Sequence, residues 1–543
     1  MLNAIVQVPT PVNEPVRAYG PGSAEKASLK KRLAEIHGQP IEIPVIVGGR
    51  EVRTGRTAQC ICPHDHAHVL ATYHQAGPDE VNQAIAAARE AWKSWSEMAW
   101  EARAAIFLKA ADLLAGPWRD TLNAATMLNQ SKTVFQAEID AACELIDFWR
   151  FNSAYMRQLY TEQPASVRGL WDYVEFRSLE GFVFAVTPFN FTSIAGNLPT
   201  SPAIMGNVVL WKPASSSVLS GYYLMKLFQA AGLPDGVINF IPGRGGSVGD
   251  PVLASDELAG IHFTGSTEVF QAMWETVGRN LRSLRSYPRI VGETGGKDFV
   301  FAHPSADVEA LVIALLRGSF EYQGQKCSAA SRGYIPKSLW PRVSERLKAE
   351  VESIRMGSPM DFRNFMCAVI DRPAFRTITE AIERAKASSD ARILVGGGFD
   401  DREGFFIEPT VIVAEDPRYE TMGVELFGPV LTLYVYDDAD LDGALELCDT
   451  TSPYALTGSI FADDRQAIIK MSAVLRHAAG NFYINDKPTA AVVGQQPFGG
   501  ARASGTNDKA GSIFNLLRWT SQRSIKETFV PPKDYHYPHM AEE

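Results

Sequence analysis

The feature that most constrains the fold is an alternation of short apolar runs with amphipathic stretches between Gly181 and Gly296. The apolar runs predict strands, and the stretches between them predict helices. Strands are expected at Phe182–Val186, Val208–Trp211, Val237–Ile241, Ile261–Thr264 and Arg289–Glu293, with helices such as Leu219–Ala231 and Thr267–Arg279. This rhythm is typical of βαβ units on a parallel sheet, in which ligands bind at strand-to-helix turns.

A second rhythm of the same kind follows Gly296 and predicts a second α/β domain. Its helices are expected near Ala306–Arg317 and Arg342–Ile354, and its strands near Ile393–Val395 and Val430–Val435. The length of 543 residues supports this division, because it exceeds what one hydrophobic core usually serves.

Two further segments precede these domains. Apolar residues recur at helical spacing over Asp79–Trp95, Ala102–Leu114 and Ile139–Phe151, which predicts a helical flank. The opening stretch to about Gly38 is rich in proline, glycine and charge, and we expect it to form a surface arm that carries no chemistry.

Composition narrows the classes of partner. The formal net charge of -10 argues against nucleic acid or an anionic membrane surface, so a small molecule is the expected partner. No apolar run approaches the roughly 18 residues that a membrane span requires. Six cysteines in so long a chain fit a reducing compartment, and the opening residues lack an apolar signal core. We expect the cytoplasm, or the mitochondrial matrix if the source is eukaryotic.

The usual phosphate-binding fingerprints are incomplete. Gly243 and Gly245 begin a GxGxxG pattern, but Val248 occupies the place of its third glycine. The stretch from Gly292 to Lys297 superficially suggests a phosphate loop, but Asp298 stands where that loop needs serine or threonine. Neither segment predicts a standard phosphate site.

Two cysteines and three histidines lie at every second position from residue 60 to residue 68, namely Cys60, Cys62, His64, His66 and His68. In one alternating strand all five side chains would point to the same face. Tetrahedral zinc usually takes ligands from two separate elements, and no second Cys/His pair is evident, so we expect no metal.

Six short motifs occur in a fixed order along the chain: Thr187-Pro188-Phe189-Asn190-Phe191, Trp211-Lys212-Pro213-Ala214, Phe263-Thr264-Gly265-Ser266, Glu293-Thr294-Gly295-Gly296-Lys297, Gly324-Gln325-Lys326-Cys327 and Glu425-Leu426-Phe427-Gly428-Pro429. Together they resemble the aldehyde dehydrogenase superfamily, from about Ile46 to Phe529. The resemblance implies an α/β fold with a Rossmann-type NAD-binding domain, an α/β catalytic domain and a small β oligomerisation flap.

The resemblance also implies domain boundaries. They are an N-terminal arm over 1–44, an NAD-binding domain over 45–162 and 179–292, a catalytic domain over 293–485, a substrate-anchor loop region over 486–511, and the flap with the C-terminal tail over 163–178 and 512–543. Family members associate through a hairpin and a C-terminal strand, here Gln163–Arg177 and Trp519–Phe529, which implies a homodimer or a larger homo-oligomer.

Aldehyde oxidation by hydride transfer requires a tetrahedral adduct, for which a cysteine thiolate supplies the bond to carbon. The resemblance makes Cys327 the nucleophile, Glu293 the base that activates the hydrolytic water, and Asn190 an oxyanion donor beside the backbone N–H of Cys327. A lone cysteine is often only a small buried hydrophobe, but the polar, glycine-containing neighbours of Cys327 are unlike a core.

The same resemblance assigns residues to NAD. Lys212 corresponds to the lysine that bonds the adenosine ribose, Ser266 opens the helix that faces the pyrophosphate, and Glu425 corresponds to the carboxylate on the nicotinamide ribose. Phe427 is expected to line the nicotinamide pocket. The other residues assigned to the cofactor cleft are Thr187, Pro188, Ser215, Phe263, Thr264 and Gly265.

Two of these positions differ from many members of the family. Ser215 stands where NAD-specific members often carry glutamate, and without that carboxylate a 2′-phosphate is not repelled, so NADP stays open as an alternative to NAD. Phe270 stands where many members have glycine, and we expect the backbone to approach the cofactor differently there.

The segments Thr133–Asp140 and Val493–Lys509, with Ser328, resemble the Δ1-pyrroline-5-carboxylate dehydrogenase group. That resemblance implies oxidation of L-glutamate γ-semialdehyde. Implied substrate contacts are Ser328, Phe191, Phe498, Ala490, Ala491 and Glu144, although Glu144 could equally be a solvated helix glutamate. The alternatives are another semialdehyde dehydrogenase, such as a succinate-semialdehyde type, a thiol hydrolase, or an inactive structural relative.

Overall fold

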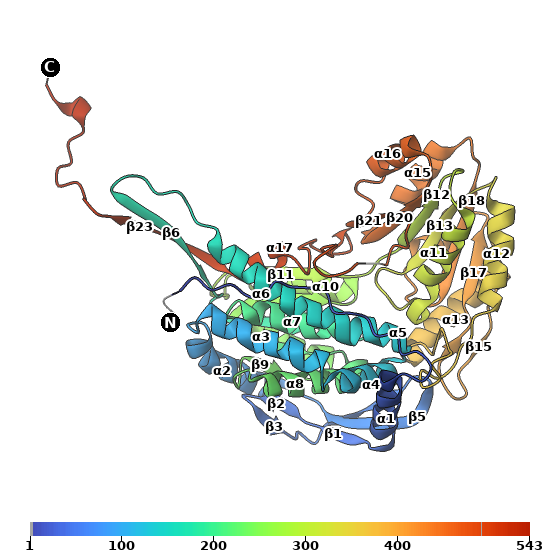
Figure 1. Ribbon diagram of the computed structural model, residues 1–543, viewed down its shortest axis with the longest axis horizontal. Coiled ribbons are helices and arrows are strands. Elements are labelled where there is room, and N and C mark those ends of the chain that lie inside the picture. The colour runs from blue at the N-terminus through green and yellow to red at the C-terminus, as the bar shows by residue number, and fades with distance from the viewer. Residues whose placement is uncertain (1–3, 490, 543) are drawn as a thin grey trace.

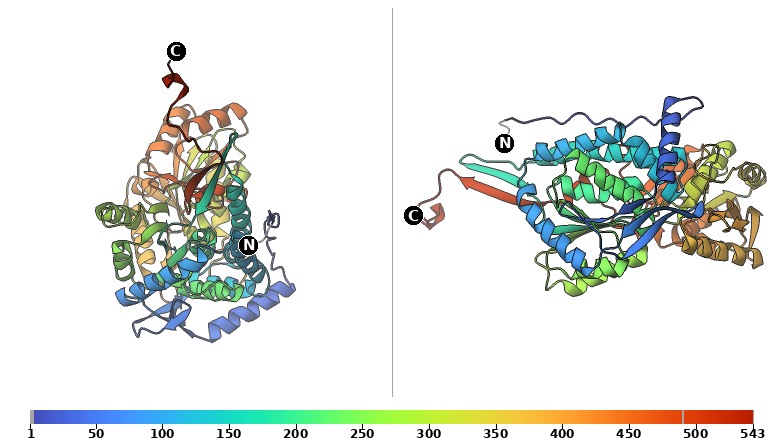
Figure 2. Two further views of the ribbon diagram at one scale, coloured as in Figure 1. Left: turned by 90° about the vertical axis from the view of Figure 1, so that its left-hand side faces the viewer. Right: turned by 90° about the horizontal axis from the view of Figure 1, so that it is seen from below.

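The computed structural model describes residues 4–489 and 491–542 and has two lobes (Figure 1). Each lobe is built on a seven-stranded sheet, and a two-stranded sheet projects from the body with the C-terminal tail beyond it (Figure 2). The predicted α/β class with two α/β domains is therefore confirmed. Within the described residues, no helix combines the length and the apolar character needed to cross a bilayer.

The first lobe carries a sheet of strand order β11-β10-β7-β8-β9-β2-β3. Its strands are β2 (Val45–Val47), β3 (Arg50–Val52), β7 (Phe182–Val186), β8 (Val208–Lys212), β9 (Ile238–Phe240), β10 (Leu258–Thr264) and β11 (Arg289–Glu293). The five later strands run parallel, while β2 and β3 are antiparallel additions at one edge. All five predicted strands of this lobe are present, two of them with the predicted bounds.

Helices cover this sheet, as parallel strands require. They are α2 (Pro78–Trp95), α3 (Trp100–Ala115), α4 (Arg119–Gln130), α5 (Val134–Ala137), α6 (Leu145–Thr161), α7 (Thr192–Ile204), α8 (Val218–Ala231), α9 (Gly245–Ala254) and α10 (Thr267–Asn280). The helix predicted at Ile139–Phe151 differs, because residues Glu138–Glu144 form a π-helix before α6 begins. A wider turn of this kind often marks a functional site, and here it carries Asp140 and Glu144.

The second lobe has the strand order β14-β17-β18-β13-β12-β20-β21, with only β14 antiparallel. Its strands are β12 (Asp298–Ala302), β13 (Ala330–Pro336), β14 (Ala391–Val395), β17 (Thr410–Ala414), β18 (Val430–Tyr436), β20 (Thr457–Phe461) and β21 (Asn481–Ile484). Its helices are α11 (Val308–Phe320), α12 (Trp340–Glu352), α13 (Arg372–Ala387), α14 (Glu420–Gly423), α15 (Leu441–Thr450) and α16 (Arg465–Val474).

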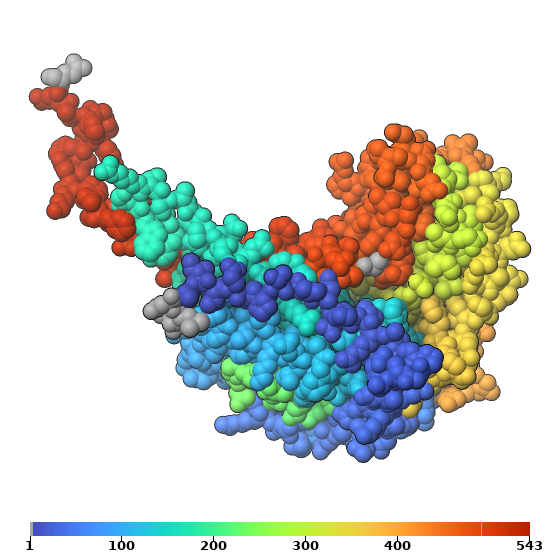
Figure 3. Space-filling model, in the orientation of Figure 1, coloured from blue at the N-terminus to red at the C-terminus, as the bar shows by residue number. Residues whose placement is uncertain are grey.

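The N-terminal arm is more ordered than predicted. Residues Ala24–Gly38 form helix α1, which is capped by Ser23 and buries Leu29 and Leu33. Ahead of it, Glu14 pairs with Arg119 at 2.5 Å and with Arg150 at 2.8 Å. The predicted arm does lie on the surface of the first lobe (Figure 3), and buried apolar and ionic contacts fix it there.

The projecting two-stranded sheet pairs β6 (Leu170–Arg177) with β23 (Ser521–Thr528) in antiparallel register. These strands lie far apart in the sequence and form a sheet of their own. The hairpin predicted at Gln163–Arg177 is therefore wrong, because that segment contributes the single strand β6. The remaining elements are β1 (Ile41–Ile43), β4 (Thr57–Cys62), β5 (Asp65–His74), β15 (Phe399–Asp400), β16 (Phe406–Ile407), β19 (Tyr454–Ala455), β22 (Ala501–Arg502) and α17 (Ile513–Leu517).

Candidate active site

The first sheet changes direction at β7, where residues from two strand ends gather. From β7 the chain continues outward through β8 and β9, and then places β10 on the other side of β7. In such sheets, ligands bind outside the carboxyl ends of the strands at this switch point. Thr187 and Pro188 follow β7, while Gly265 and Ser266 follow β10, so both predicted segments border one crevice.

Two polar groups at this crevice retain capacity for a ligand. Ser266 is the N-cap of α10, and its Oγ accepts the N–H of Val269 at 3.4 Å. The first turn of a helix offers further N–H groups to an anion such as pyrophosphate. Lys212 is half-buried, and its one hydrogen bond within the described residues is a long contact of 3.4 Å to the carbonyl of Pro213. The ammonium is therefore free to bond a ribose hydroxyl.

Aromatic and small residues shape the rest of the crevice. Phe263 stacks on Phe270 with ring centroids 5.3 Å apart. The ring of Phe270 lies where a side chain at Gly292 would be, since a Cβ added there would be 2.2 Å from it. Phe270 thus packs against the glycine that precedes Glu293, while the N–H of Gly265 donates to the carbonyl of Glu293 at 3.2 Å.

The remaining predicted cofactor residues on this side have structural partners. The hydroxyl of buried Thr187 accepts the indole N–H of Trp211 at 3.0 Å. Thr264 lines a pocket that also contains Cys327 and Glu293. Ser215 is exposed and its hydroxyl bonds the hydroxyl of Tyr73. Position 215 therefore offers a hydroxyl where many NAD-specific members of the family carry a glutamate.

Glu425 enters the crevice from the second lobe. Its Oε1 accepts the N–H of Gly296 at 2.9 Å, and burial raises the pKa of Glu425 to about 7. A Cβ on Gly295 would lie 2.3 Å from Oε2 of Glu425, so the close approach requires glycine. Phe427 has a left-handed backbone conformation with φ 54°, and its ring meets that of Phe189 edge-on at 5.8 Å.

Cys327 and Glu293 come together from different lobes. The Cys327 thiol donates to Oε1 of Glu293 with 2.9 Å between Sγ and oxygen. Glu293 ends β11 of the first sheet, and Cys327 lies just before β13 of the second. The nucleophile and a carboxylate base therefore meet at the junction of the two lobes.

Burial and mutual contact determine the protonation of this pair. Burial raises the pKa of Glu293 to about 7, while the hydrogen bond from the thiol opposes that rise. Burial, and then the Glu293 charge, raise the pKa of the Cys327 thiol well above its ordinary range. At neutral pH, Cys327 is therefore a thiol that donates a hydrogen bond to Glu293. The carboxyl group of Glu293 titrates near neutrality.

The turn that leads to Cys327 is buried and strained. Tyr322 and Gln323 both have φ 55°, a left-handed conformation that non-glycine residues rarely adopt. The amide of Gln323 donates to the carbonyls of Ser131 at 3.0 Å and Ala368 at 2.8 Å, which holds the turn in place. We expected a loop unlike a core, but its polar residues are buried: hydrogen bonds hold Gln323 and the amide oxygen of Gln325, while the amide nitrogen of Gln325 is buried with no hydrogen-bond partner among the described residues.

Asn190 lies beside this turn. Its side-chain amide donates to the carbonyl of Gln325 at 3.1 Å, two residues before the nucleophile. The next residue, Phe191, is the N-cap of α7, and its ring faces the ammonium of Lys132 at 4.1 Å. The geometry thus brings the predicted oxyanion donor next to the predicted nucleophile.

Lys132 is a buried residue that the sequence analysis missed. Its ammonium pairs with Asp140 at 2.7 Å and lies 4.4 Å from the ring of Tyr322. Asp140 also accepts the N–H groups of Thr192 at 2.9 Å and Ser193 at 2.8 Å, at the start of α7. One ammonium therefore joins the Asn190 loop to the nucleophile turn. Its position directly before the quoted Thr133–Asp140 segment was the available signal.

A pocket of about 310 Å³ opens onto Cys327 and Glu293. Of the residues predicted to bind substrate, the lining includes Ser328, Phe191, Ala491, Phe498 and Glu144. The hydroxyl of Ser328 donates to Oγ1 of Thr489 at 3.1 Å, which connects the nucleophile strand to the anchor loop. The predicted contact Ala490 lies outside the described residues.

Glu144 faces the pocket and is not a solvated helix glutamate. It belongs to the π-helix, and its Oε2 accepts the hydroxyl of Ser193 at 2.9 Å. Burial, and then the charge of Asp140, raise the pKa of Glu144 to about 8. Burial therefore disfavours the charged carboxylate of Glu144, and a cation placed beside it would favour that charged form.

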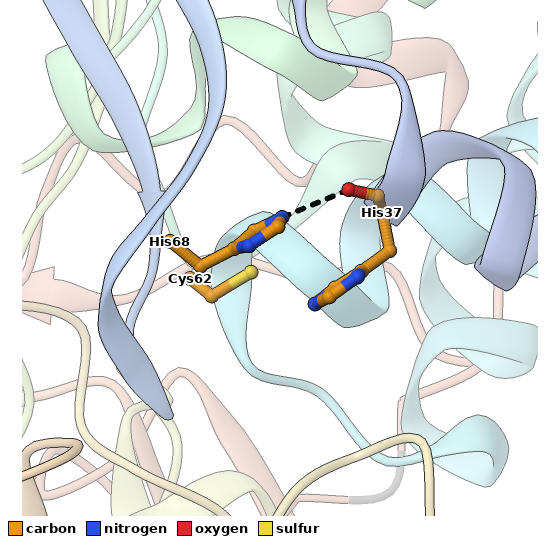
Figure 4. A group of neighbouring side chains, drawn as sticks. All are labelled: His37, Cys62 and His68. Atoms are coloured by element: carbon orange, nitrogen blue, oxygen red, sulfur yellow. Dashed lines mark hydrogen bonds between the residues drawn. The ribbon is translucent and has the colours of Figure 1, made fainter.

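The cysteine and histidine cluster is not one strand. Pro63 and His64 form a turn between β4 and β5, so the predicted common face does not exist. Instead His37 of α1 joins Cys62 and His68, with ligand atoms within 4.8 Å of one another (Figure 4). The two imidazole rings are stacked 3.8 Å apart and only 6° from parallel, so their in-plane lone pairs do not converge on one ion.

Comparisons with known proteins agree with this geometry. The family model described as "Aldehyde dehydrogenase family" matches residues 51–525. The chain is 54% identical over 540 residues to a protein of Dictyostelium discoideum named Delta-1-pyrroline-5-carboxylate dehydrogenase, mitochondrial, covering 99% of this chain and 97% of the relative. A Bos taurus protein of the same name is 49% identical over 529 residues, with 97% and 94% coverage.

Solved structures give the same result. The crystal structure of the Delta-pyrroline-5-carboxylate dehydrogenase from Mycobacterium tuberculosis bound with NAD is similar with a TM-score of 0.97, at 54% sequence identity and with 100% of both chains covered. Another structure of that protein, bound with NAD and cobalamin, has a TM-score of 0.96 at 53% identity. On the family model and these relatives, the chain belongs to the aldehyde dehydrogenase family.

Proposed function

We propose that this enzyme oxidises L-glutamate γ-semialdehyde to L-glutamate with NAD, the second step of proline breakdown. The observation that carries the proposal is the 2.9 Å contact between the Cys327 thiol and Glu293, at a pocket between the two lobes. The relatives named Delta-1-pyrroline-5-carboxylate dehydrogenase, and the neighbouring structure bound with NAD, support the substrate and the cofactor.

Catalysis begins with removal of the Cys327 proton by Glu293, which is already its hydrogen-bond acceptor. The sulfur then bonds to the aldehyde carbon, and the carbonyl oxygen becomes an oxyanion. The Asn190 amide and the backbone N–H of Cys327 are the proposed donors to that oxygen. When bound, NAD supplies the acceptor for the hydride that leaves the carbon, which converts the adduct into a thioester on Cys327.

The second half of the cycle hydrolyses that thioester. Glu293 releases to solvent the proton that it took from Cys327 and then takes a proton from water, and the resulting hydroxide bonds to the acyl carbon. The carbon–sulfur bond breaks, the Cys327 thiolate regains a proton from Glu293, and the carboxylic acid product dissociates. A base with a pKa of about 7 suits this step, because an adequate fraction is ionised at neutral pH.

The crevice residues fit a dinucleotide. Lys212 and Glu425 would hold the two ribose hydroxyl pairs, and the α10 N-terminus at Ser266 would face the pyrophosphate. Phe427 would border the nicotinamide. Thr187, Pro188, Phe263, Thr264 and Gly265 form the walls, and Ser215 leaves the adenine-ribose side without an acidic side chain.

The pocket residues fit an amino-acid semialdehyde. Phe191 and Phe498 would enclose the aliphatic chain, while Ser328 and the loop containing Ala490 and Ala491 would anchor the carboxylate. Glu144 would read the ammonium, since a nearby cation favours the charged carboxylate that burial disfavours.

The domain division inferred from the resemblance completes the proposal. The NAD-binding domain covers 45–162 and 179–292, the catalytic domain 293–485, and the anchor region 486–511, with the arm over 1–44 and the flap over 163–178 and 512–543. Six free cysteines support a reducing compartment, which we propose to be the cytoplasm. The mitochondrial matrix is the alternative, since the names of the Dictyostelium and cattle relatives include "mitochondrial".

We expect the flap to make the enzyme a homodimer or a larger homo-oligomer. Apolar side chains on it and on the tail that follows it are exposed, among them Trp171 of β6 at 53% and Val530, beyond the end of β23, at 81%. Such exposure on a projecting two-stranded sheet indicates a partner surface. Light scattering should give a multiple of the 59.5 kDa chain mass, and Trp171→Asp should shift the population toward the single chain. A monomeric wild-type protein would contradict this prediction.

A substrate panel with NAD and NADP tests the proposed function. We expect kcat/KM for L-glutamate γ-semialdehyde to exceed that for succinate semialdehyde by about 10-fold or more, because a polar pocket group left unpaired penalises the analogue without the ammonium. We expect NAD to be preferred. A higher kcat/KM with succinate semialdehyde would reassign the substrate, and no NADH from any aldehyde would favour a thiol hydrolase or an inactive relative.

A further inference from the structure

Among the described residues, the hydrogen bonds from the N-terminal arm to the substrate-anchor region are made by one side chain, that of Asn13. Its amide nitrogen donates to the carbonyl of Val493 at 2.8 Å and to Oδ2 of Asp147 at 2.8 Å. Its amide oxygen accepts the side-chain N–H of Gln495 at 3.1 Å. In Figure 3 the dark-blue arm runs across the first lobe beside the red and orange C-terminal segments.

The arm is itself held firmly at this point. The backbone N–H of Glu14 donates to Oδ1 of Asp147 at 2.7 Å, so one carboxylate receives two neighbouring arm residues. The Glu14 carboxylate pairs with Arg119 and Arg150, and the N–H of Arg17 donates to Glu138 at 2.9 Å. Asn13 is therefore a fixed point against which another segment can be placed.

Residues 491–496, called the anchor segment below, form few other hydrogen bonds. Val492 and Gln496 bond to each other within the segment: the Gln496 side chain accepts from the Val492 N–H at 3.0 Å, and the Gln496 N–H donates to the Val492 carbonyl at 3.0 Å. Among the described residues, the hydrogen bonds that join 491–496 to the rest of the chain are those to Asn13. The segment is a small closed turn whose polar attachment comes from the arm.

Apolar packing, together with the hydrogen bonds to Asn13, fixes the position of the turn formed by residues 491–496. Val493 is 6% exposed, and Gly494 has φ 82° and lies against the ring of Phe151. The same segment continues back to Ala491, which lines the substrate pocket, and to Thr489, which accepts from Ser328. A displacement of Val493 would therefore move the residues proposed to bind the substrate carboxylate.

We infer that Asn13 is a positioning residue for substrate selectivity. It touches no substrate, but it holds the anchor segment at the distance from Ser328 that suits a carboxylate-bearing aldehyde. The inference rests on the proposed function for the identity of that aldehyde. Whatever the aldehyde, the hydrogen bonds of Asn13 hold the anchor segment against the arm.

The test compares Asn13→Ala with Gln7→Ala, a matched loss of an amide side chain on the same arm. Gln7 is exposed and has no side-chain hydrogen bond within the described residues. We expect Asn13→Ala to raise KM for L-glutamate γ-semialdehyde about 5-fold or more, as the loss of polar contacts of ordinary strength predicts. The values of kcat, KM for NAD, and kcat/KM for propanal should stay within 2-fold of wild type, and Gln7→Ala should change nothing.

Hydrogen–deuterium exchange supplies a readout that needs no activity. Peptides covering 489–496 should exchange faster in Asn13→Ala than in Gln7→Ala, while peptides from α12 exchange at the same rate in both. Unchanged exchange, an unchanged KM for the semialdehyde, or an equal loss with propanal would overturn the inference. Absence of aldehyde oxidation by the wild-type enzyme would instead reject the proposed function, and faster exchange would then still support the arm's role.

Discussion

Replacing Cys327 with alanine is expected to reduce NADH formation from any aldehyde by about 10⁴-fold or more, because no other group can form the covalent adduct from which hydride leaves. The thiol is the atom that meets Glu293 at 2.9 Å, and the described lining of the pocket contains no second cysteine. Binding of NAD should be retained, because the proposed cofactor contacts lie on other residues. Absorbance at the NADH band measures turnover, and calorimetric titration measures NAD binding.

Cys448→Ala is the matched control for this substitution. Cys448 is fully buried in α15 of the same lobe, and burial raises the pKa of its thiol to about 12, so it has the character of a core residue. We expect its activity to remain near the wild-type value. Turnover by Cys327→Ala above a few per cent of wild type would remove Cys327 from the role of nucleophile.

The parts of the fold that local pattern determines were predictable. β7 and β11 have the predicted bounds because each apolar run is buried along its length and ends at a glycine, a proline or a polar residue. The hairpin of β4 and β5 was missed although Pro63 gave a signal, since proline interrupts a strand. The alternating positions of the cysteines and histidines predicted Cys62 and His68 on one strand. The turn at Pro63 and His64 places them on two strands, β4 and β5.

The parts of the site that depend on tertiary contact were not predictable from this sequence. The motif resemblance named Cys327 and Glu293, but nothing in the spacing of 34 positions between them gives their 2.9 Å contact. Lys132 has a place between two aromatic rings that only the folded chain creates. Asn13 lies 480 positions from the carbonyl it binds, and no periodicity connects the two.

Replacing Glu293 with glutamine is expected to divide the catalytic cycle into a first half, in which the Cys327 thiol loses its proton to solvent instead of to Glu293, and a stalled second half. An amide cannot accept the water proton, so the thioester should persist once hydride has left. Rapid mixing should show an NADH burst approaching one equivalent per active site, followed by a steady rate about 10²–10⁴-fold below wild type. Mass spectrometry of quenched enzyme should show the acyl group on the peptide that contains Cys327. A full steady rate would place the base elsewhere.

The pH dependence of the turnover rate also identifies Glu293 as the base, when it is compared with that of a Glu425 variant. Burial raises the pKa of Glu293 to about 7, so the base is present above that pH and is lost below it. Wild-type turnover should therefore fall as the pH decreases through about 7. Glu425 also has a pKa raised to about 7 by burial, so the pH profile alone does not distinguish the two.

Glu425→Gln resolves that ambiguity. Its carboxylate contacts the backbone N–H of Gly296 and the proposed nicotinamide side of the crevice, and has no proposed part in hydrolysis. This variant should form NADH linearly without a burst and should keep the fall in rate below pH 7. Glu293→Gln should show the burst and lose that fall, because the titrating base is gone. If the two variants exchanged these behaviours, water activation would belong to Glu425, and the 2.9 Å contact with Cys327 would serve only to deprotonate the thiol.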